Sequence, residues 1–265
     1  MIAPTQKKSG PIPRKLRYLQ AAVIIGLSIV YTGLAAGSGA DRLTATRPEM
    51  APTIPAQFAS EALRVAGAQA LADGDVRATL ALGKRALRDA PADPQSAAMF
   101  GAGLLASGDQ APADQAFRVA GRLGWRVPIT QSYWLGKALS ASDYDLAALR
   151  LDALLRQQPQ LLSQRQVMDP MERNPAGRAA LIKRMALHPE WLPVYTADVQ
   201  STPPDVVMQR SAVFEEAAHQ GLMLGCDAIA PIIARLIALN LRDQAGRLSQ
   251  VHCRAQQPAP NSIAP

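Results

Sequence analysis

Three short segments of the chain share one pattern, and their spacing decides the fold. They read Leu71-Ala72-Asp73-Gly74-Asp75, Leu105-Ala106-Ser107-Gly108-Asp109 and Leu139-Ser140-Ala141-Ser142-Asp143. The interval from Leu71 to Leu105 equals that from Leu105 to Leu139. Small and polar residues of this kind mark turns between regular elements. The constant spacing therefore predicts a unit of two helices and a turn, repeated over about residues 60 to 161.

The residues around each turn predict one helix before it and one after it. Stretches rich in small residues precede the turns, at residues 62–72, 96–106 and 130–141. Pro91 and Pro159 close the first and third copies at the same phase. The second helices carry small and large apolar residues, namely Thr79, Ala86 and Leu87, then Ala113, Phe117 and Ala120, then Ala147, Leu151, Leu154 and Leu155.

A helix–turn–helix unit of this length, with small residues at the crossing and proline at its end, resembles the tetratricopeptide repeat. The family's first helix has a glycine, which Gly67 and Gly101 supply, whereas Leu135 stands there in the third copy. Trp125 stands where the second copy's closing proline is expected. Because one helix pair cannot bury its apolar face alone, the resemblance implies an α-solenoid of about three stacked pairs with a cap on the last. An ordinary helical bundle with coincident turns is the alternative.

The resemblance also implies a concave surface, lined by the first helices, on which relatives bind peptides. Arg64 is the only cation among its residues, which disfavours a receptor for C-terminal carboxylates. Alanine, glycine and leucine there suit an apolar helix, either from another protein or from the chain's own C-terminal region. By phase, this partner groove holds Glu61, Arg64, Ala68, Leu71, Gln95, Ala98, Ala102, Leu105, Ile129, Ser132, Gly136 and Leu139.

A second feature is an uncharged stretch that runs from Tyr18 to Ala40. About twenty apolar residues in a helix span the hydrocarbon core of a bilayer, because each residue adds about 1.5 Å. The stretch has no polar face, which argues against a helix buried in a soluble core. It therefore predicts a transmembrane helix at residues 18–40.

The charges beside this helix predict its orientation. The residues that follow it are mixed in sign, as Asp41 and Arg42 illustrate. By the positive-inside rule, residues 1–17 form a basic cytoplasmic tail, and the bulk of the chain lies on the outer side. We expect a single-pass protein of a bacterial inner membrane with its bulk in the periplasm. The basic residues that precede the helix, with no acid among them, are Lys7, Lys8, Arg14, Lys15 and Arg17.

Two alternatives concern the fate of this helix. Ser38-Gly39-Ala40 offers small residues before Asp41, as at the cleavage site of a signal peptide. The long basic region and the length of the apolar stretch favour an uncleaved signal anchor instead. Gly33 and Gly37 have the spacing of helices that pair within membranes, so the helix is also a candidate for self-association.

The distribution of charge bears on the class of partner. The formal net charge is +7, but the tail holds five of the 28 basic residues, which leaves 23 against 21 acidic residues in the exported part. No basic face with stacking aromatic residues is evident in that part. The sequence therefore predicts no nucleic-acid partner.

The remaining segments complete an all-α fold. A linker at residues 41–57 precedes the repeats at 58–161, and a C-terminal helical region at 162–255 follows them. Six prolines break residues 162–204. Composition predicts that residues 256–265 form a disordered tail. In the C-terminal region we expect helices at about 176–188, 205–224, 227–240 and 243–254.

Cys226 and Cys253 are the only cysteines of the chain. They lie at equal distances from a bend predicted at Asn240-Leu241-Arg242, and so at the open end of one helical hairpin. In an oxidising compartment this geometry predicts a disulfide, which is worth about 3 kcal/mol by loop closure. Two buried free thiols are the alternative.

The sequence offers little chemistry. His188, His219 and His252 lack the spacing of a metal site, and neither a cofactor motif nor a catalytic constellation is present. We therefore expect a non-enzymatic scaffold that assembles a bacterial envelope machine for secretion, pilus formation, polysaccharide export or cofactor maturation. The alternative is an envelope enzyme or wall-binding module in the C-terminal region, with polar residues at Glu172-Arg173, Arg178 and Glu190-Trp191.

Overall fold

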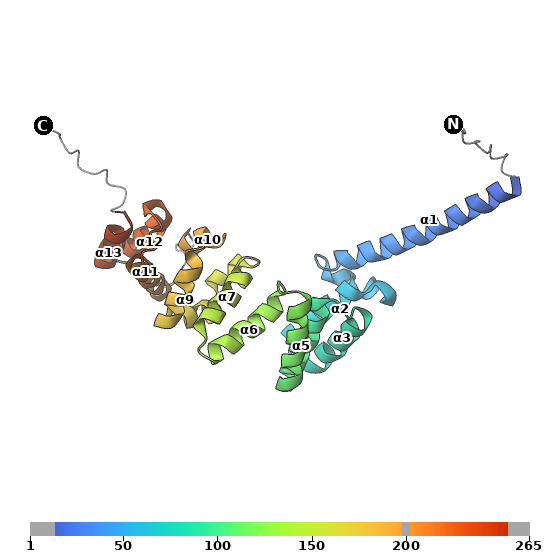
Figure 1. The fold of residues 1–265 in the computed structure, drawn as a ribbon, viewed down its shortest axis with the longest axis horizontal. Coiled ribbons are helices and arrows are strands. Elements are labelled where there is room, and N and C mark those ends of the chain that lie inside the picture. Colours follow the sequence, from blue (N-terminus) through green and yellow to red (C-terminus); the bar gives the residue numbers. More distant parts are fainter. Residues whose placement is uncertain (1–13, 198–201, 254–265) are drawn as a thin grey trace, which may run out of the picture. The chain divides into compact units, whose positions relative to one another are not determined.

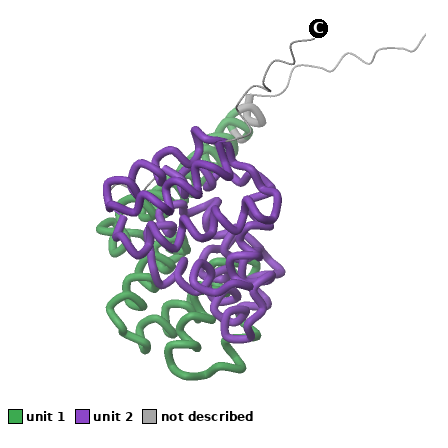
Figure 2. Tube along the Cα trace, turned by 90° about the vertical axis from the view of Figure 1, so that its left-hand side faces the viewer, with its two compact units in different colours: residues 1–116 green, residues 117–265 purple. Residues whose placement is uncertain are grey.

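The computed structural model describes residues 14–197 and 202–253 (Figure 1). Within these ranges all regular secondary structure is helical, which confirms the predicted all-α class. The chain forms two compact units, unit 1 at residues 1–116 and unit 2 at residues 117–265 (Figure 2). The basic tail up to residue 13 and the predicted tail at 256–265 lie outside the described residues.

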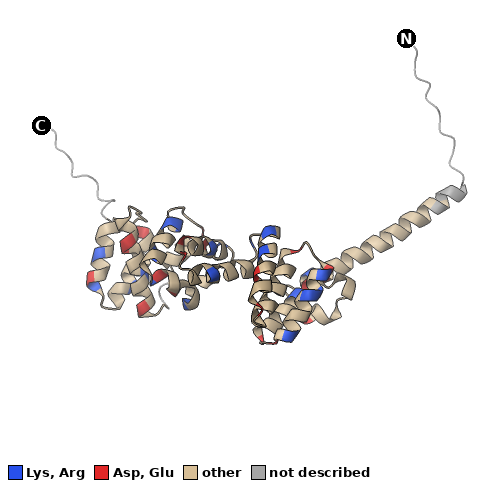
Figure 3. Ribbon diagram, turned by 60° about the horizontal axis from the view of Figure 1, so that its bottom comes forward, with Lys and Arg blue, Asp and Glu red and all other residues tan. Residues whose placement is uncertain are grey.

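Helix α1, Arg14–Leu43, contains the predicted transmembrane stretch. Its segment Gln20–Leu43 is long and apolar enough to cross a membrane, and none of its most apolar part is buried in the structure. In Figure 3 the described part of the α1 ribbon carries the colour of uncharged residues up to its C-terminal end. The first charged residues after the stretch are Asp41 and Arg42. No other helix among the described residues meets this test.

The end of α1 packs against the start of the helical domain. Both carboxylate oxygens of Asp41 accept backbone hydrogen bonds at 2.9 Å, from the N–H groups of Glu61 and Ala62 in the first turn of α2, Ser60–Ala72. A Cβ atom on Gly37 would lie 2.5 Å from the ring of Phe58. Asp41 thus acts as a cap for a helix that is distant in sequence.

The predicted linker at residues 41–57 is therefore not a free tether. It forms two 3₁₀ turns, η1 at Pro48–Thr53 and η2 at Ala56–Phe58. Ile54 is buried between them, in a small apolar cluster with α2 and α3. The apolar side chains within this proline-rich stretch explain why it packs instead of remaining extended.

The helix boundaries follow the period of the sequence. Helices α2, α4 at Pro94–Ala106 and α6 at Pro128–Ser140 begin at one constant interval, and α3 at Val76–Asp89, α5 at Gln110–Leu123 and α7 at Tyr144–Leu155 begin at the same interval. The predicted alternation of two helices with one turn is confirmed for all three copies. Membership of the tetratricopeptide family stays a prediction.

The three repeated turns share a backbone conformation. Gly74, Gly108 and Ser142 occupy the same position in successive copies and have φ values of +73°, +88° and +56°. The aspartate that follows caps the next helix in the first and third copies: Asp75 accepts from the N–H of Ala78 at 2.9 Å, and Asp143 from that of Leu146 at 3.0 Å. A left-handed residue followed by a capping carboxylate is thus what the repeated sequence encodes.

In unit 1, α3 lies between α2 and α4 and crosses α4 closely. A Cβ atom on Gly83 would lie 2.9 Å from the backbone of Phe100, and one on Gly103 would lie 3.1 Å from that of Leu80. The absence of side chains at these positions allows the two helices to approach. Glycine is therefore required here by packing, despite its low helix propensity.

Unit 2 contains the third helix pair together with the whole C-terminal region. α7 packs against α9, and one continuous apolar cluster extends from Leu135 to Leu248. The break in the chain's packing lies at 116/117 and not at the expected boundary of 161/162, because α7 buries Leu151, Leu154 and Leu155 in this shared core. The other elements of the region are η3 at Pro159–Ser163, α8 at Arg165–Glu172, α9 at Pro175–Met185, α10 at Leu192–Ala197, α11 at Pro204–His219, α12 at Cys226–Ala238 and α13 at Arg242–Cys253.

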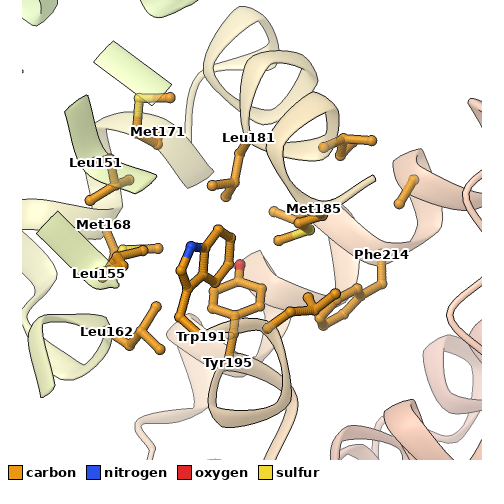
Figure 4. Close-up of a cluster of buried hydrophobic side chains, with 14 of the residues drawn as sticks. Leu151, Leu155, Leu162, Met168, Met171, Leu181, Met185, Trp191, Tyr195 and Phe214 are labelled. Atoms are coloured by element: carbon orange, nitrogen blue, oxygen red, sulfur yellow. The ribbon is translucent and has the colours of Figure 1, made fainter. Parts of the chain in front are cut away.

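Aromatic rings and methionines form the centre of this core (Figure 4). The ring centroid of Tyr195 lies 6.1 Å from that of Trp191 and 5.5 Å from that of Phe214, and both pairs are edge to face. Such contacts add to the area that the rings bury. The contact between Tyr195 and Phe214 attaches α10 to α11. The short helix α10 was not predicted from the sequence.

The last two helices form the predicted hairpin. Asn240 is left-handed, with φ of +61°, and ends α12 at the expected bend. Cys226 begins α12 and Cys253 ends α13; their Cα atoms are 4.6 Å apart and their sulfurs are at bonding distance. The predicted bridge therefore fits the backbone without movement.

We predict that Gly83→Ala lowers the free energy of unfolding by about 1–3 kcal/mol, because the added methyl meets helix backbone that must shift. Gly136→Ala is the matched control, since its Cβ would meet nothing within 4 Å. Gly136→Ala should leave the free energy of unfolding unchanged or raise it by up to about 1 kcal/mol. Urea denaturation of the full chain in non-ionic detergent, followed by circular dichroism, compares the two; equal effects would contradict the close crossing.

We also predict that replacing Cys226 and Cys253 together with serine lowers the free energy of unfolding by about 3 kcal/mol. A reducing agent should lower the stability of the wild type by a similar amount and leave the double variant unchanged. Peptide mapping without reduction should recover the two cysteines in one linked pair. Two alkylatable thiols in protein taken from an oxidising compartment would show that the bridge does not form.

Candidate functional site

The predicted groove residues of unit 1 are not all open to a partner. Ala98 and Ala102 are the predicted apolar groove positions on α4. They are 0% and 6% exposed, so a bound helix would not reach them. These two positions are therefore closed in this structure, because α4 is composed of small residues that pack on nearly all sides. Ala68, Gln95 and Leu105 are exposed, whereas Glu61, Arg64 and Leu71 are half-buried.

Arg64 is engaged within unit 1. Its guanidinium pairs with Glu61, one turn earlier, and with Asp93, whose Oδ2 lies 3.1 Å from Nη1. Asp93 caps α4 and accepts from the N–H and hydroxyl of Ser96 at 2.9 and 2.7 Å. Burial acts to raise the pKa of Asp93, but the hydrogen bonds from Ser96 and the charge of Arg64 prevail and lower it. This arginine therefore joins α2 to the start of α4.

The groove residues of unit 2 lie on α6. Ser132 and Gly136 are exposed, and Ile129 and Leu139 are half-buried. Leu139 packs against the apolar core that the third pair shares with the C-terminal helices. In this unit, part of the predicted surface is thus covered by the chain's own C-terminal region.

A different site, which the sequence did not predict, lies in unit 2 between the end of α5, the start of α6 and α7. It is a pocket of about 240 Å³ that we call the arginine pocket. Three arginines and two tryptophans line it, and no carboxylate does. Its lining residues are Arg118, Gly121, Arg122, Trp125, Thr130, Gln131, Trp134 and Arg150.

Gln131 organises one wall of the arginine pocket. It is 1% exposed; its amide Nε2 donates to the carbonyl of Trp125, and its Oε1 accepts from Nη1 of Arg150 at 3.2 Å. Thr130 is fully buried, and its hydroxyl has no hydrogen-bond partner among the described residues. Nε of Arg150 is also buried and has no hydrogen-bond partner among the described residues. The wall thus presents donors that the described chain does not satisfy.

A signal for this pocket was present in the sequence. Arg118 and Arg122 are four residues apart and therefore share one face of α5, and Trp125 and Arg126 follow just after that helix ends at Leu123. The guanidinium of Arg126 lies 4.8 Å from the centroid of the Trp125 ring. Arginines and tryptophans thus gather locally at this pocket, while the absence of a nucleic-acid partner stays a prediction.

A buried charged group lies at the centre of unit 2. Glu172 accepts from the hydroxyl of Tyr195 at 2.8 Å, and Nε of Arg210 lies 3.7 Å from the same carboxylate oxygen. Arg210 also donates to the carbonyl of Leu162 at 2.7 Å and stacks over the Tyr195 ring. Burial raises the pKa of Glu172, although the bond from Tyr195 and the charge of Arg210 oppose it. Burial, aided by Glu172, also raises the pKa of Tyr195 well above its usual value.

The polar residues considered for a C-terminal enzyme do not converge on an accessible site. Glu172 and Trp191 are each 1% exposed, and the indole of Trp191 donates to Asp152 at 2.7 Å. Arg178 pairs with Glu216 at 2.7 Å. Arg173 and Glu190 are exposed, and Arg173 pairs with Asp169 at 3.0 Å. Glu172, Arg178 and Trp191 instead join helices of unit 2.

The histidines give no metal site. No group of three or more histidine, cysteine, aspartate or glutamate residues within 14–197 and 202–253 is placed to hold a metal ion. His188 and His219 are exposed, whereas His252 is buried beside the disulfide.

His252 joins three segments of the C-terminal hairpin region. Its Nε2 lies 3.0 Å from the carbonyl of Phe214, which only accepts, so Nε2 carries the hydrogen. Its Nδ1 accepts from the N–H of Leu224 at 3.4 Å. Acceptance at Nδ1 needs the neutral ring, whereas donation from Nε2 is possible in either protonation state. Burial lowers the pKa of His252, although the carbonyl of Phe214 opposes that change.

Comparisons with models of protein families, with curated proteins and with solved structures found no significant match to this chain.

We predict that His252 makes stability depend on pH. Its pKa is lower in the folded chain than the unfolded value of about 6.5, so its contribution is present above that pH and is lost as the pH falls. The free energy of unfolding should fall by about 1.4 kcal/mol for each pH unit that separates the pKa of the folded chain from that of the unfolded chain. Urea titrations between about pH 7.5 and 5 should give a flatter profile for His252→Gln than for the wild type.

His219→Gln, at an exposed position, is the control for this prediction and should keep the pH profile of the wild type. Parallel profiles for the wild type and His252→Gln would exclude a neutral, buried His252 as a source of the pH dependence.

Proposed function

We propose that this chain is a non-enzymatic scaffold, anchored by α1 in a bacterial inner membrane, which binds another envelope protein through its helical units. The observation that carries the proposal is the exposed apolar surface of Gln20–Leu43. A helix of this length and composition exposes far more apolar area to water than a soluble protein tolerates, and a bilayer would cover it.

The packing at the end of α1 supports an anchor that stays attached. Cleavage after Ala40 would remove Gly37 and Ala40, both of which pack against the first helices of unit 1. It would also uncover one side of the Phe58 ring. A segment that serves only as a signal has no reason to contribute to the folded core.

The orientation rests on two observations. The basic residues of the tail favour a cytoplasmic N-terminus by the positive-inside rule. A Cys226–Cys253 bridge would persist in the periplasm, where thiols are oxidised, and would be uncommon in the cytoplasm.

The repeated helix pairs support a role in protein binding. Pairs that begin at a constant interval resemble the tetratricopeptide array, whose relatives bind peptides. Because Ala98 and Ala102 are buried, we propose that the partner contacts the exposed positions Ala68, Gln95 and Leu105 of unit 1. We propose that this partner belongs to an envelope machine for secretion, pilus formation, polysaccharide export or cofactor maturation.

Self-association through the membrane helix is not part of the proposal, because the ring of Phe58 covers Gly37. An enzymatic C-terminal region is not part of it either, since no observation favours one. Glu172 and Trp191, two of the residues named for that alternative, are buried in contacts with their own unit.

We predict that a photo-crosslinking residue at position 68 or 105 captures another envelope protein in cells. Position 187 in unit 2, where the leucine is 61% exposed, provides a control with an accessible side chain outside the proposed surface. Mass spectrometry of the crosslinked products identifies what is bound. Recovery of the chain alone, or the same proteins from all three positions, would count against the proposed surface.

The anchor is tested in the same strain. Membranes washed at alkaline pH should retain the full-length chain, and a protease added to the periplasm should digest the helical units while sparing an N-terminal tag. Release of a shortened chain into the periplasm would refute retention of α1.

A further inference from the structure

We propose that the arginine pocket of unit 2 binds a phosphate ester, with its guanidinium groups and the Thr130 hydroxyl around the phosphate and a tryptophan ring against the organic part. The proposal does not depend on the scaffold function, because it concerns a small ligand and residues outside the partner surface proposed above.

The charge of the pocket is the first observation. Arg118, Arg122 and Arg150 line a space of about 240 Å³ with no carboxylate among the lining residues. Elsewhere in unit 2, arginines such as Arg156 and Arg178 pair with acidic side chains. Three permanent positive charges that share a small space repel one another, and an anion between them removes that repulsion.

The arginines of the pocket are not neutralised by the chain itself. Among the described residues, Arg118 and Arg122 form no ion pair, and the partner that the structure gives Arg150 is the neutral amide of Gln131 at 3.2 Å. Gln131 fixes Arg150 while leaving its charge uncompensated.

The unsatisfied donors are the second and independent observation. Thr130 is 0% exposed, lines the pocket, and its hydroxyl has no hydrogen-bond partner in the described chain. Nε of Arg150 is likewise buried without a partner. Buried polar groups are nearly always hydrogen-bonded, and an acceptor held in the pocket would satisfy these two.

The number of donors favours phosphate over carboxylate. One carboxylate is satisfied by a single arginine fork, whereas a phosphate offers more oxygens and up to two negative charges for several guanidinium groups. The volume suits one such group with a small organic part and is too small for several nucleotides of a strand.

The tryptophans suggest what the phosphate is attached to. Trp125 is 56% exposed at the rim, where Arg126 lies over its ring at 4.8 Å. Trp134 is half-buried, and Gly121 leaves the space in front of it open, since a Cβ there would still be 4.0 Å from the indole nitrogen. A flat or apolar group next to the phosphate would contact these rings.

The test measures quenching of tryptophan fluorescence in the full chain, held in non-ionic detergent, during titration with inorganic phosphate, methyl phosphate and phenyl phosphate at constant ionic strength. We expect saturable binding, with phenyl phosphate the tightest of the three. Arg118→Gln combined with Arg122→Gln should weaken binding by about tenfold or more, because charge-assisted hydrogen bonds are lost. Arg77→Gln combined with Arg88→Gln removes the same charge from exposed positions of α3 and should leave binding unchanged.

A second variant tests the pocket without changing its charge. Gly121→Leu places a side chain in the open space and should abolish binding while the circular dichroism spectrum and the thermal midpoint stay close to the wild type. A short-chain phosphatidic acid added to the micelles distinguishes the source of the phosphate. Tighter binding of this lipid than of phenyl phosphate assigns the pocket to lipid headgroups, and the reverse order assigns it to soluble esters; either order supports a phosphate site.

Several results would overturn the proposal. The first is the absence of saturable binding by any of the phosphates. The second is an equal loss of affinity in the two double-arginine variants, which would indicate only general attraction. Unchanged binding in Gly121→Leu would place the site elsewhere. Benzoate that binds as tightly as phenyl phosphate would assign the pocket to carboxylates, and affinity that rises with the length of an oligonucleotide would assign the face to nucleic acid.

Discussion

The repeats depend on one constraint: a single helix pair has more apolar surface than it can cover. In unit 1 the constraint is met by a close crossing of α3 and α4, which Gly83 and Gly103 allow. In unit 2 it is met by the C-terminal helices, which share one apolar core with the third pair. How the apolar surface of each helix pair is covered determines three features. They are the burial of Ala98, the position of α7 and the place where the two units divide.

Much of the fold was accessible from the sequence because its signals are local. A constant repeat period, turns with a left-handed residue before an aspartate, and an uncharged stretch near the N-terminus each depend on neighbouring residues. The hairpin of α12 and α13 was predictable for the same reason, since its bend and its two cysteines are symmetric in sequence. Asp41 was not predictable as a cap, because its partners at Glu61 and Ala62 are brought to it only by folding.

The candidate site was harder to predict, because it depends on which side chains are satisfied. Ala98 and Ala102 have the phase of an open groove, but the sequence cannot show that packing covers them. Arg118 and Arg122 resemble many surface arginines until the structure places Arg150 and the unsatisfied Thr130 beside them. The regular spacing of Arg118, Arg122 and Arg126 was visible, yet the near-neutral total charge of the exported part obscured it.

The contact between Asp41 and the first turn of α2 has a further consequence for a chain anchored as we propose. Within unit 1, helix α2 is joined to the membrane helix by hydrogen bonds and packing instead of a flexible tether, so the reach of the following helices of this unit from the bilayer is short. A short, stiff connection confines a binding surface to a thin layer, which raises its effective concentration toward partners in the same membrane and lowers it toward those farther away. The distance of a partner from the membrane would then limit which proteins can bind, before side-chain contacts discriminate among them.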